Sequence, residues 1–226
     1  MKSTERLKKC IATSILAAIS LVLYLVGPKF SLPIFPSFLV INFSMLPIFI
    51  AILTMGPIEG LVIVLIRTLI KLPATNTAGI GETADLVIGF FLVGFTFLGN
   101  IIFGKKKHYI PLFLFSILGW VLGGLVSNAF ALPMYVNVLN AKGWVVGSLH
   151  KIIPDVNEGN YVMYYFLLAV LPFNLLLSSV VCIITYGVYL PLHKYTDQFF
   201  GKEISENKYI DSDKETITSN TYKDIE

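Results

Sequence analysis

The chain alternates between long apolar stretches and short segments that are polar or carry glycine and proline. A helix needs about 20 apolar residues to cross a bilayer, and six stretches reach or approach this length. The second and third are short, and only Met55, Gly56 and Pro57 separate them, which predicts a tight turn. The pattern predicts an all-α, polytopic membrane protein with six transmembrane helices. The stretches lie at residues 9–27, 38–54, 57–72, 82–103, 109–135 and 161–191.

Composition supports a membrane as the surroundings of these helices. Apolar residues make up 55% of the chain and charged residues only 14%, whereas a soluble domain carries about 25% charged residues. This balance excludes a soluble enzyme, a nucleic-acid-binding protein and a disordered chain. We expect residues 1–192 to form the six-helix membrane domain. Residues 193–226 are polar and mixed in charge, which predicts a disordered cytoplasmic tail.

Basic residues in short loops predict the orientation in the membrane, because they favour the cytoplasmic side. Four basic residues lie at the N-terminus, Lys105–Lys107 follow the fourth stretch, and Lys194 and Lys202 follow the sixth. With six spans, all of these lie on one side. Both termini are therefore predicted to be cytoplasmic, and the loop at residues 136–160 is predicted to lie outside.

Four ionisable residues fall at membrane depth, where a charge at a helix centre costs about 2.5 to 3.5 kcal/mol. Arg67 and Lys71 are four residues apart, so they share one face of the third stretch. Glu82 and Asp85 open the fourth stretch, three residues apart. They form either two ion pairs that join these helices or contacts to a ligand, and the two roles are compatible.

Two asparagines in apolar surroundings are the strongest candidates for ligand contact. Asn128 and Asn174 fall in the outer halves of the fifth and sixth stretches. An amide carries two donor hydrogens and an acceptor oxygen, so it can pair with the polar edge of a neutral heterocycle. The alternative is a hydrogen bond between helices. Pro172 is expected to loosen the helix beside Asn174, because proline lacks the N–H of a helical residue.

The first stretch carries two overlapping pairs of small residues at a spacing of four. The pairs are Thr13 with Ala17 and Ser14 with Ala18, which give a smooth face that another helix can approach closely. This face either packs inside the bundle or binds a partner membrane protein.

No motif for catalysis or metal binding is expected in this chain. The segment Gly99–Lys105 has most of a phosphate-binding loop, but Lys106 stands where that loop needs serine or threonine, and the segment ends a helix. Cys10 and Cys182 stand alone, without the spacing of a metal site or redox pair. We therefore expect neither an enzyme nor a resident cofactor.

Four stretches and the small-residue face together resemble the substrate-capture (S) subunits of energy-coupling-factor vitamin transporters, within them the riboflavin-specific type. The resemblance covers roughly residues 10–192. The stretches are Leu39–Pro47 (LVINFSMLP), Thr77–Asp85 (TAGIGETAD), Ser127–Tyr135 (SNAFALPMY) and Leu171–Leu175 (LPFNL).

The resemblance implies a protein of the bacterial cytoplasmic membrane that binds riboflavin from outside in a pocket in its outer half. It implies that Glu82, Asn128 and Asn174 contact the flavin, with FMN left open as a second ligand. It also implies that the small-residue face couples the chain to a transmembrane coupling protein, which works with two ATPase subunits. Riboflavin is then the transported ligand and not a cofactor.

The chain departs from the riboflavin-specific pattern at three positions. Met45 replaces an aspartate, Arg67-Thr68 replaces a lysine–asparagine pair, and Leu177 replaces a lysine. A contact from Arg67 or Lys71 is one way to replace the lysine. The alternatives are another vitamin or precursor as the ligand of the same class of transporter and, in a different class, a membrane-embedded lipid-modifying enzyme.

Overall fold

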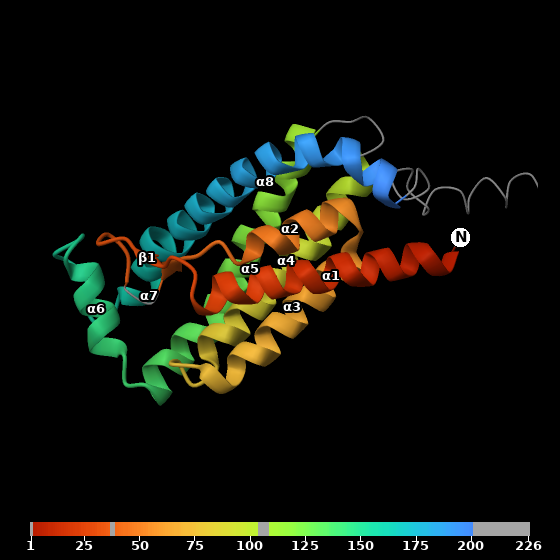
Figure 1. The fold of residues 1–226 in the computed structure, drawn as a ribbon. Helices are drawn as coiled ribbons and strands as arrows, with labels where there is room; N and C mark the ends of the chain where they lie inside the picture. Colours follow the sequence, from red (N-terminus) through yellow and green to blue (C-terminus); the bar gives the residue numbers. More distant parts are fainter. Residues whose placement is uncertain (1, 37–38, 104–108, 201–226) are drawn as a thin grey trace, which may run out of the picture.

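The computed structural model describes residues 2–36, 39–103 and 109–200, which form an elongated bundle of helices (Figure 1). In chain order the elements are α1 (Lys2–Leu25), β1 (Phe30–Ser31), β2 (Val40–Ile41), α2 (Met45–Thr54), α3 (Pro57–Lys71), η1 (Leu72–Ala74), α4 (Ile80–Phe103), α5 (Tyr109–Val138), α6 (Lys142–His150), α7 (Tyr161–Tyr164), η3 (Tyr165–Val170) and α8 (Leu171–Phe200). The two short strands pair antiparallel, with Phe30 opposite Ile41.

The predicted all-α class is confirmed, and among the described residues four helical segments are long and apolar enough to cross a membrane. The helices α2 and α3 have 10 and 15 residues. At 1.5 Å per residue they extend about 15 and 22 Å, less than the roughly 30 Å of a hydrocarbon core. The four long segments are Thr4–Leu25, Ile80–Phe103, Tyr109–Val138 and Tyr161–Leu192.

The second apolar stretch is only partly helical, which corrects the expected span at residues 38–54. Val40 and Ile41 form strand β2, and helix α2 begins at Met45. Pro47 explains the late start, because a proline is tolerated in the first turn of a helix but breaks a hydrogen bond in the interior. An earlier start would place Pro47 in the interior.

The tight turn predicted between the second and third stretches is confirmed. Helix α2 ends at Thr54 and α3 begins at Pro57. Gly56 has φ = 125°, a conformation that side chains disfavour. Pro57 is the first residue of α3, where its missing N–H costs nothing.

The last helix is continuous from Tyr161 to Phe200 but contains a π-helical segment, η3, immediately before Leu171. Pro172 follows within two residues and cannot donate a backbone hydrogen bond to the carbonyl one turn earlier. The expected loosening of the helix beside Asn174 is therefore present as this π-helical segment. The proposed boundary at residue 192 stays a prediction: α8 continues to Phe200, and residues 201–226 and Lys105–Lys107 lie outside the described residues.

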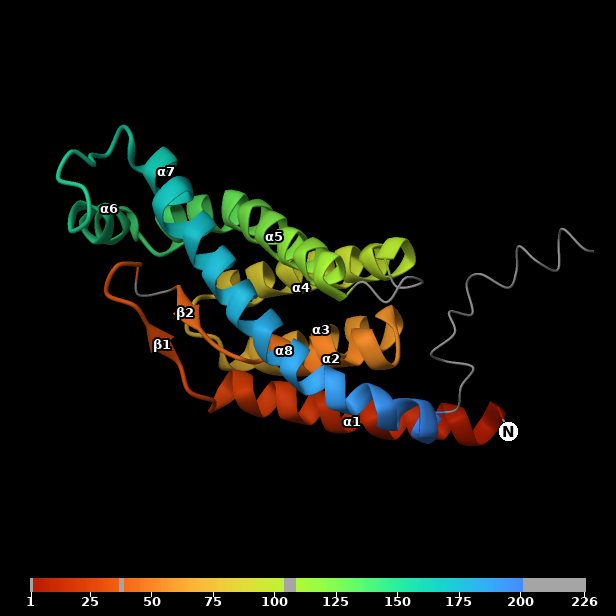
Figure 2. The ribbon, with the colours of Figure 1, turned by 90° about the horizontal axis from the view of Figure 1, so that it is seen from above.

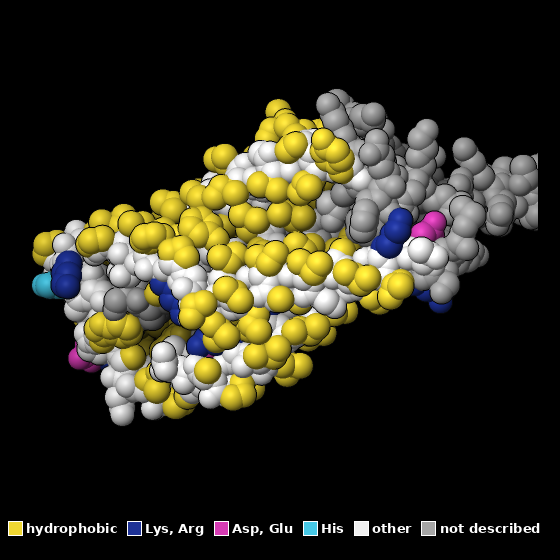
Figure 3. Space-filling model, viewed as in Figure 1, with side chains coloured by type: hydrophobic (Ala, Val, Ile, Leu, Met, Phe, Trp, Pro, Cys, Tyr) yellow, Lys and Arg dark blue, Asp and Glu magenta, His cyan; other side chains and the backbone are white. Residues whose placement is uncertain are grey.

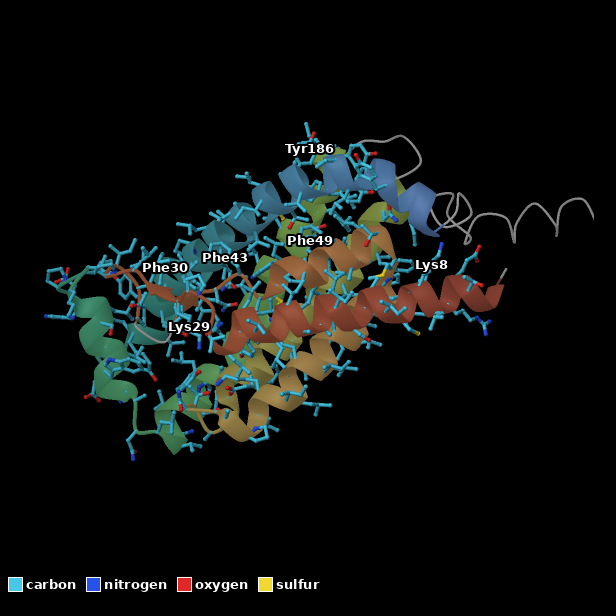
Figure 4. The ribbon with its side chains drawn as sticks, in the orientation of Figure 1. Lys8, Lys29, Phe30, Phe43, Phe49 and Tyr186 are labelled. Carbon is cyan, nitrogen blue, oxygen red and sulfur yellow. The ribbon has the colours of Figure 1, made fainter. Side chains whose placement is uncertain are left out.

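Different elements lie at the two ends of the bundle. The start of α1 and the last turns of α8 lie at the same end, and α6 and the β1–β2 hairpin lie at the other (Figures 1 and 2). Figure 4 places Lys8 near the first end and Lys29 and Phe30 near the second. Hydrophobic side chains cover the length between the ends on the face shown in Figure 3. We call the two ends the terminal end and the hairpin end.

Candidate functional site

All six side chains predicted to bind a ligand lie within the bundle, and most of them are removed from solvent. Burial of an ionised or amide group is costly unless hydrogen bonds or opposite charges compensate it. Each of these residues therefore needs partners, and the structure supplies them from several elements. Arg67, Lys71, Glu82, Asn128 and Asn174 are buried, and Asp85 is half-buried.

The charged residues of α3 and α4 face each other in two ion pairs. Arg67 Nη2 lies 4.0 Å from Asp85 Oδ2, and Lys71 Nζ lies 3.9 Å from Glu82 Oε1. The prediction that these residues join the two helices is confirmed. Both distances are at the outer limit of an ion pair, so additional groups must hold the charges in place.

Glu82 is held mainly by the loop that precedes α4. Its Oε2 accepts hydrogen bonds from the hydroxyls of Thr75 (2.7 Å) and Thr77 (3.0 Å). Thr75 Oγ1 also accepts from the backbone N–H groups of Thr77 and Gly79. Gly79 adopts φ = 83°, which glycine tolerates. The loop therefore folds around the carboxylate of Glu82 with its hydroxyls directed inward.

Arg67 is a fully buried guanidinium between α1, α2 and α4. Its Nη1 donates to Ser44 Oγ at 2.7 Å, and its Cζ lies 4.7 Å from the centre of the Tyr24 ring, a cation–π contact. Within the described residues, its Nε and Nη2 donate no hydrogen bond. The hydroxyl of Tyr24 also lies within hydrogen-bonding reach of Asp85.

Ser44 joins this charged group to the hairpin end. Its hydroxyl donates to Asn42 Oδ1 at 2.6 Å, and its carbonyl accepts from Ser20 Oγ at 2.6 Å. One residue thus connects α1, the start of α2 and, through Arg67, helix α3. Met45, which replaces an aspartate of the riboflavin-specific pattern, follows directly and is buried.

The two candidate asparagines lie where α5 packs against the η3–α8 helix. Asn128 Nδ2 donates to Gly124 O at 2.8 Å, and Asn128 Oδ1 accepts from the hydroxyl of Tyr165 at 2.6 Å. Asn174 Nδ2 donates to Val170 O at 2.9 Å. Within the described residues, Asn174 Oδ1 accepts no hydrogen bond, so this amide keeps a free acceptor.

Gly124 brings the two asparagines together. A Cβ at this position would lie 2.5 Å from Asn174 Cγ, so the backbone of α5 is in direct contact with the amide of α8. The carbonyl of the same glycine accepts from Asn128. The close approach of α5 and α8 at this level therefore depends on a residue without a side chain.

Tyr135 lies between the asparagines and the charged group. It is buried, and its hydroxyl forms a hydrogen bond with Thr77. Thr77 also donates to Glu82, and Tyr135 lies about two turns beyond Asn128 on α5. The two polar groups therefore adjoin each other in the part of the bundle nearer the hairpin end.

A cavity of about 450 Å³ lies farther out, at the hairpin end. One wall is the segment from Ser31 to Phe35, and the other is α6. None of the six predicted ligand residues lines it. Phe35 forms part of its wall and meets Phe173 edge to face, with ring centres 5.4 Å apart. Phe173 directly precedes Asn174, so this wall of the cavity contacts the helix that carries the asparagine.

The small-residue face of α1 divides into two parts. Thr13 and Ala17 are buried in the bundle, and Thr13 Oγ1 lies 3.8 Å from Met55 Sδ. Ser14 and Ala18 are exposed. Thr13 and Ala17 therefore pack inside the bundle, whereas Ser14 and Ala18 remain available to bind a partner.

Several contributors to the site were not identified from the sequence. Tyr165 carried a detectable signal, because a tyrosine in an apolar helix needs a partner for its hydroxyl. Thr75 and Thr77 carried a weaker one, since they stand in the polar loop before Glu82. Gly124 and Tyr24 carried none, because their roles depend on which helix packs opposite them.

The chain matches the family model described as "ECF transporter, substrate-specific component" over residues 8–189. It is 31% identical to the riboflavin transporter RibU of Streptococcus thermophilus over 196 residues, covering 82% of each chain. It is 24% identical to the riboflavin transporter FmnP of Bacillus subtilis over 197 residues, covering 85% of this chain and 96% of that one.

A solved structure has a similar fold. It is the S component of a bacterial ECF transporter, with a TM-score of 0.61 and 23% sequence identity, and the match covers 84% of this chain and 98% of that one. The family model spans most of this chain and overlaps each of the four long apolar helices among the described residues. This chain therefore belongs to the family of substrate-specific components of ECF transporters, which are integral membrane proteins and not enzymes.

Proposed function

We propose that this chain binds riboflavin from outside the cell and delivers it inward together with a transmembrane coupling protein and two ATPase subunits. The observation that supports riboflavin as the ligand is the pair of buried amides of Asn128 and Asn174, which both contact Gly124. The similarity to riboflavin transporters of Bacillus subtilis, Staphylococcus aureus and Streptococcus thermophilus supports it.

The chemistry of the amide pair suits the polar edge of a flavin ring. That edge alternates carbonyl oxygens and ring nitrogens, so it needs both donors and acceptors at fixed positions. Asn174 offers a free acceptor oxygen, and each amide has a second N–H beyond the one used within its own helix. The flat apolar remainder of the ring is suited to the buried aromatic and aliphatic side chains of α5 and α8.

The charged residues take two roles in this proposal. Glu82 is the acceptor for the ligand's hydroxyl groups, and Thr75 and Thr77 orient its carboxylate. Arg67, Lys71 and Asp85 neutralise the site and hold α3 against α4. A contact from Arg67 or Lys71 replaces the lysine of the riboflavin-specific pattern, because this chain has the buried Leu177 at that position.

We also propose the topology and the partner surface. The start of α1 and the last turns of α8 lie at the same end of the bundle, which supports six membrane segments with both termini in the cytoplasm and with α2 and α3 as a short hairpin within the bundle (Figure 1). The exposed Ser14 and Ala18 form the surface for the coupling protein, whereas Thr13 and Ala17 hold α1 against the bundle.

Titration of purified protein with riboflavin, followed by quenching of flavin fluorescence, tests the ligand site. Asn128→Leu and Asn174→Leu keep the volume but remove the amide, which strands a polar group of the ligand in a dry site. The expected cost is about 1 to 3 kcal/mol, or roughly 5- to 150-fold in Kd. Asn100→Leu, in the terminal half of α4, is the matched control and should bind normally. Unchanged affinity in both amide variants would refute this site.

The alternative ligand is another vitamin or precursor with a similar polar edge. Mass spectrometry of the small molecule that co-purifies with the protein distinguishes it. Protein that co-purifies a different compound, and does not quench riboflavin fluorescence, would refute riboflavin while leaving the transporter class in place.

A further inference from the structure

The cavity at the hairpin end has the size and lining of a small-molecule site, although none of the proposed ligand residues reaches it. Its volume of about 450 Å³ is within the usual range for ligand pockets. One wall carries Trp144, whose side chain is 47% exposed, and the opposite wall carries Phe35. Lys151 at the rim is the one charged residue among those that line it.

The wall formed by α6 is flat and open. Gly143 and Gly147 are one helical turn apart and both line the cavity. A Cβ at either position would have no heavy atom within 4 Å, so the space above the helix backbone is empty. A planar ring can therefore lie directly against this face, with Trp144 beside it.

Helix α6 is held in place from both of its sides. Val145 and Leu149, on its opposite face, are fully buried in the main core. Lys142, its first residue, donates to Glu158 Oε2 at 2.7 Å. This bond lowers the pKa of Glu158, so the pair stays ionised to a lower pH than an unpaired glutamate would. Gly143 and Gly147 therefore lie on a helix that is held in place by its contacts with the rest of the bundle.

We propose that this cavity is an outer docking site for the planar aromatic ring of the transported ligand, separate from the amide pair and occupied before it. The inference rests on the proposed function, because it takes riboflavin as the ligand. Phe35 lines the cavity and packs against Phe173, which directly precedes Asn174, so the cavity adjoins the helix that carries this asparagine without including it. The chemistry selected is a flat aromatic ring, and Lys151 favours one without a cationic tail.

A site on the path of the ligand has a distinct kinetic signature. Its residues contact the ligand in the docked state and in the transition state through which the ligand passes inward, but not when the ligand is finally bound. Removing them therefore slows association and dissociation by the same factor and leaves Kd, the ratio of the two rates, unchanged. A residue of the final site instead changes Kd.

The test is stopped-flow quenching of riboflavin fluorescence with ligand-free protein in detergent. Gly147→Leu fills the cavity, and Gly187→Leu is the matched control, because Gly187 also has open space but lies on α8 away from the cavity. We expect both rate constants to fall at least about fivefold in Gly147→Leu, the lower end for loss of one aromatic stacking contact. The control should match the wild type.

A second pair of variants tests the same site if Gly147→Leu does not fold. Trp144→Ala should slow both rates, and Trp144→Phe, which keeps an aromatic face, should restore them. Unchanged rates in all the cavity variants would overturn the docking site and would leave Trp144 as a lipid anchor at the membrane surface. A raised Kd with faster dissociation would also overturn it, because the cavity would then belong to the final site. Wild-type protein that does not bind riboflavin would overturn the proposed function itself.

Discussion

Replacing Gly124 by alanine should weaken riboflavin binding without destabilising the fold. The new Cβ would lie 2.5 Å from Asn174 Cγ, whereas ordinary carbon contacts are about 3.5 Å. The amide must therefore move by about 1 Å, and a hydrogen bond of typical length stretched that far is lost. One lost bond in a dry site costs about 1 to 3 kcal/mol, or roughly 5- to 150-fold in Kd.

The stability of the ligand-free protein should change little, because two effects oppose each other. Alanine is about 1 kcal/mol more favourable than glycine inside a helix, which offsets the cost of moving one flexible side chain. The assay is a riboflavin titration with a thermal melt of the ligand-free protein. Gly94→Ala, in open space on α4, is the control and should bind normally. Wild-type affinity in Gly124→Ala would refute the placement of Asn174 in the ligand site.

Three further changes test the other parts of the site. Tyr165→Phe removes the donor to Asn128 Oδ1 and should lower the unfolding free energy by about 1 kcal/mol in a chemical denaturation series; no change would show that the bond is replaced by water. Ala18→Trp should abolish transport but keep riboflavin binding in detergent, whereas Ala17→Trp should disrupt the fold, because that position is buried; equal behaviour of the two would contradict the division of α1. Glu82→Gln leaves a buried lysine without its opposite charge and should lower the melting temperature of ligand-free protein, and a variant that binds normally would remove Glu82 from the ligand contacts.

The apolar pattern determined which long segments are helical, because a membrane leaves the backbone no other way to satisfy its hydrogen bonds within one segment. Helices α4 and α5 and the continuous helix from Tyr161 therefore follow from length and hydropathy alone. The turn at Gly56 and Pro57 follows from local geometry, since both residues act through their own backbone. The facing of Arg67 and Lys71 toward Glu82 and Asp85 was also predictable, because buried charges need opposite partners.

The second apolar stretch shows where hydropathy is insufficient. Residues 38–54 are mostly apolar, with Asn42 and Ser44 as polar residues near the start, and strand and helix can both bury such a run. Val40 and Ile41 pair with β1 across the loop that joins the two strands, so the choice depends on a contact outside the apolar stretch itself. The local signs of a later helix start are Pro47 and Ser44, a residue type that often precedes the first turn of a helix.

Only the tertiary structure decided which face of each helix meets which neighbour. Thr13 and Ser14 are adjacent small residues, yet one is buried and the other exposed, because the rotation of α1 is set by its packing against α2 and α3. Asn128 and Asn174 were identified as polar residues in apolar helices, but their contact through Gly124 depends on the crossing of α5 and α8. The sequence shows that a buried polar side chain needs a hydrogen-bonding partner. Which residue becomes that partner depends on how helices far apart in the chain pack together.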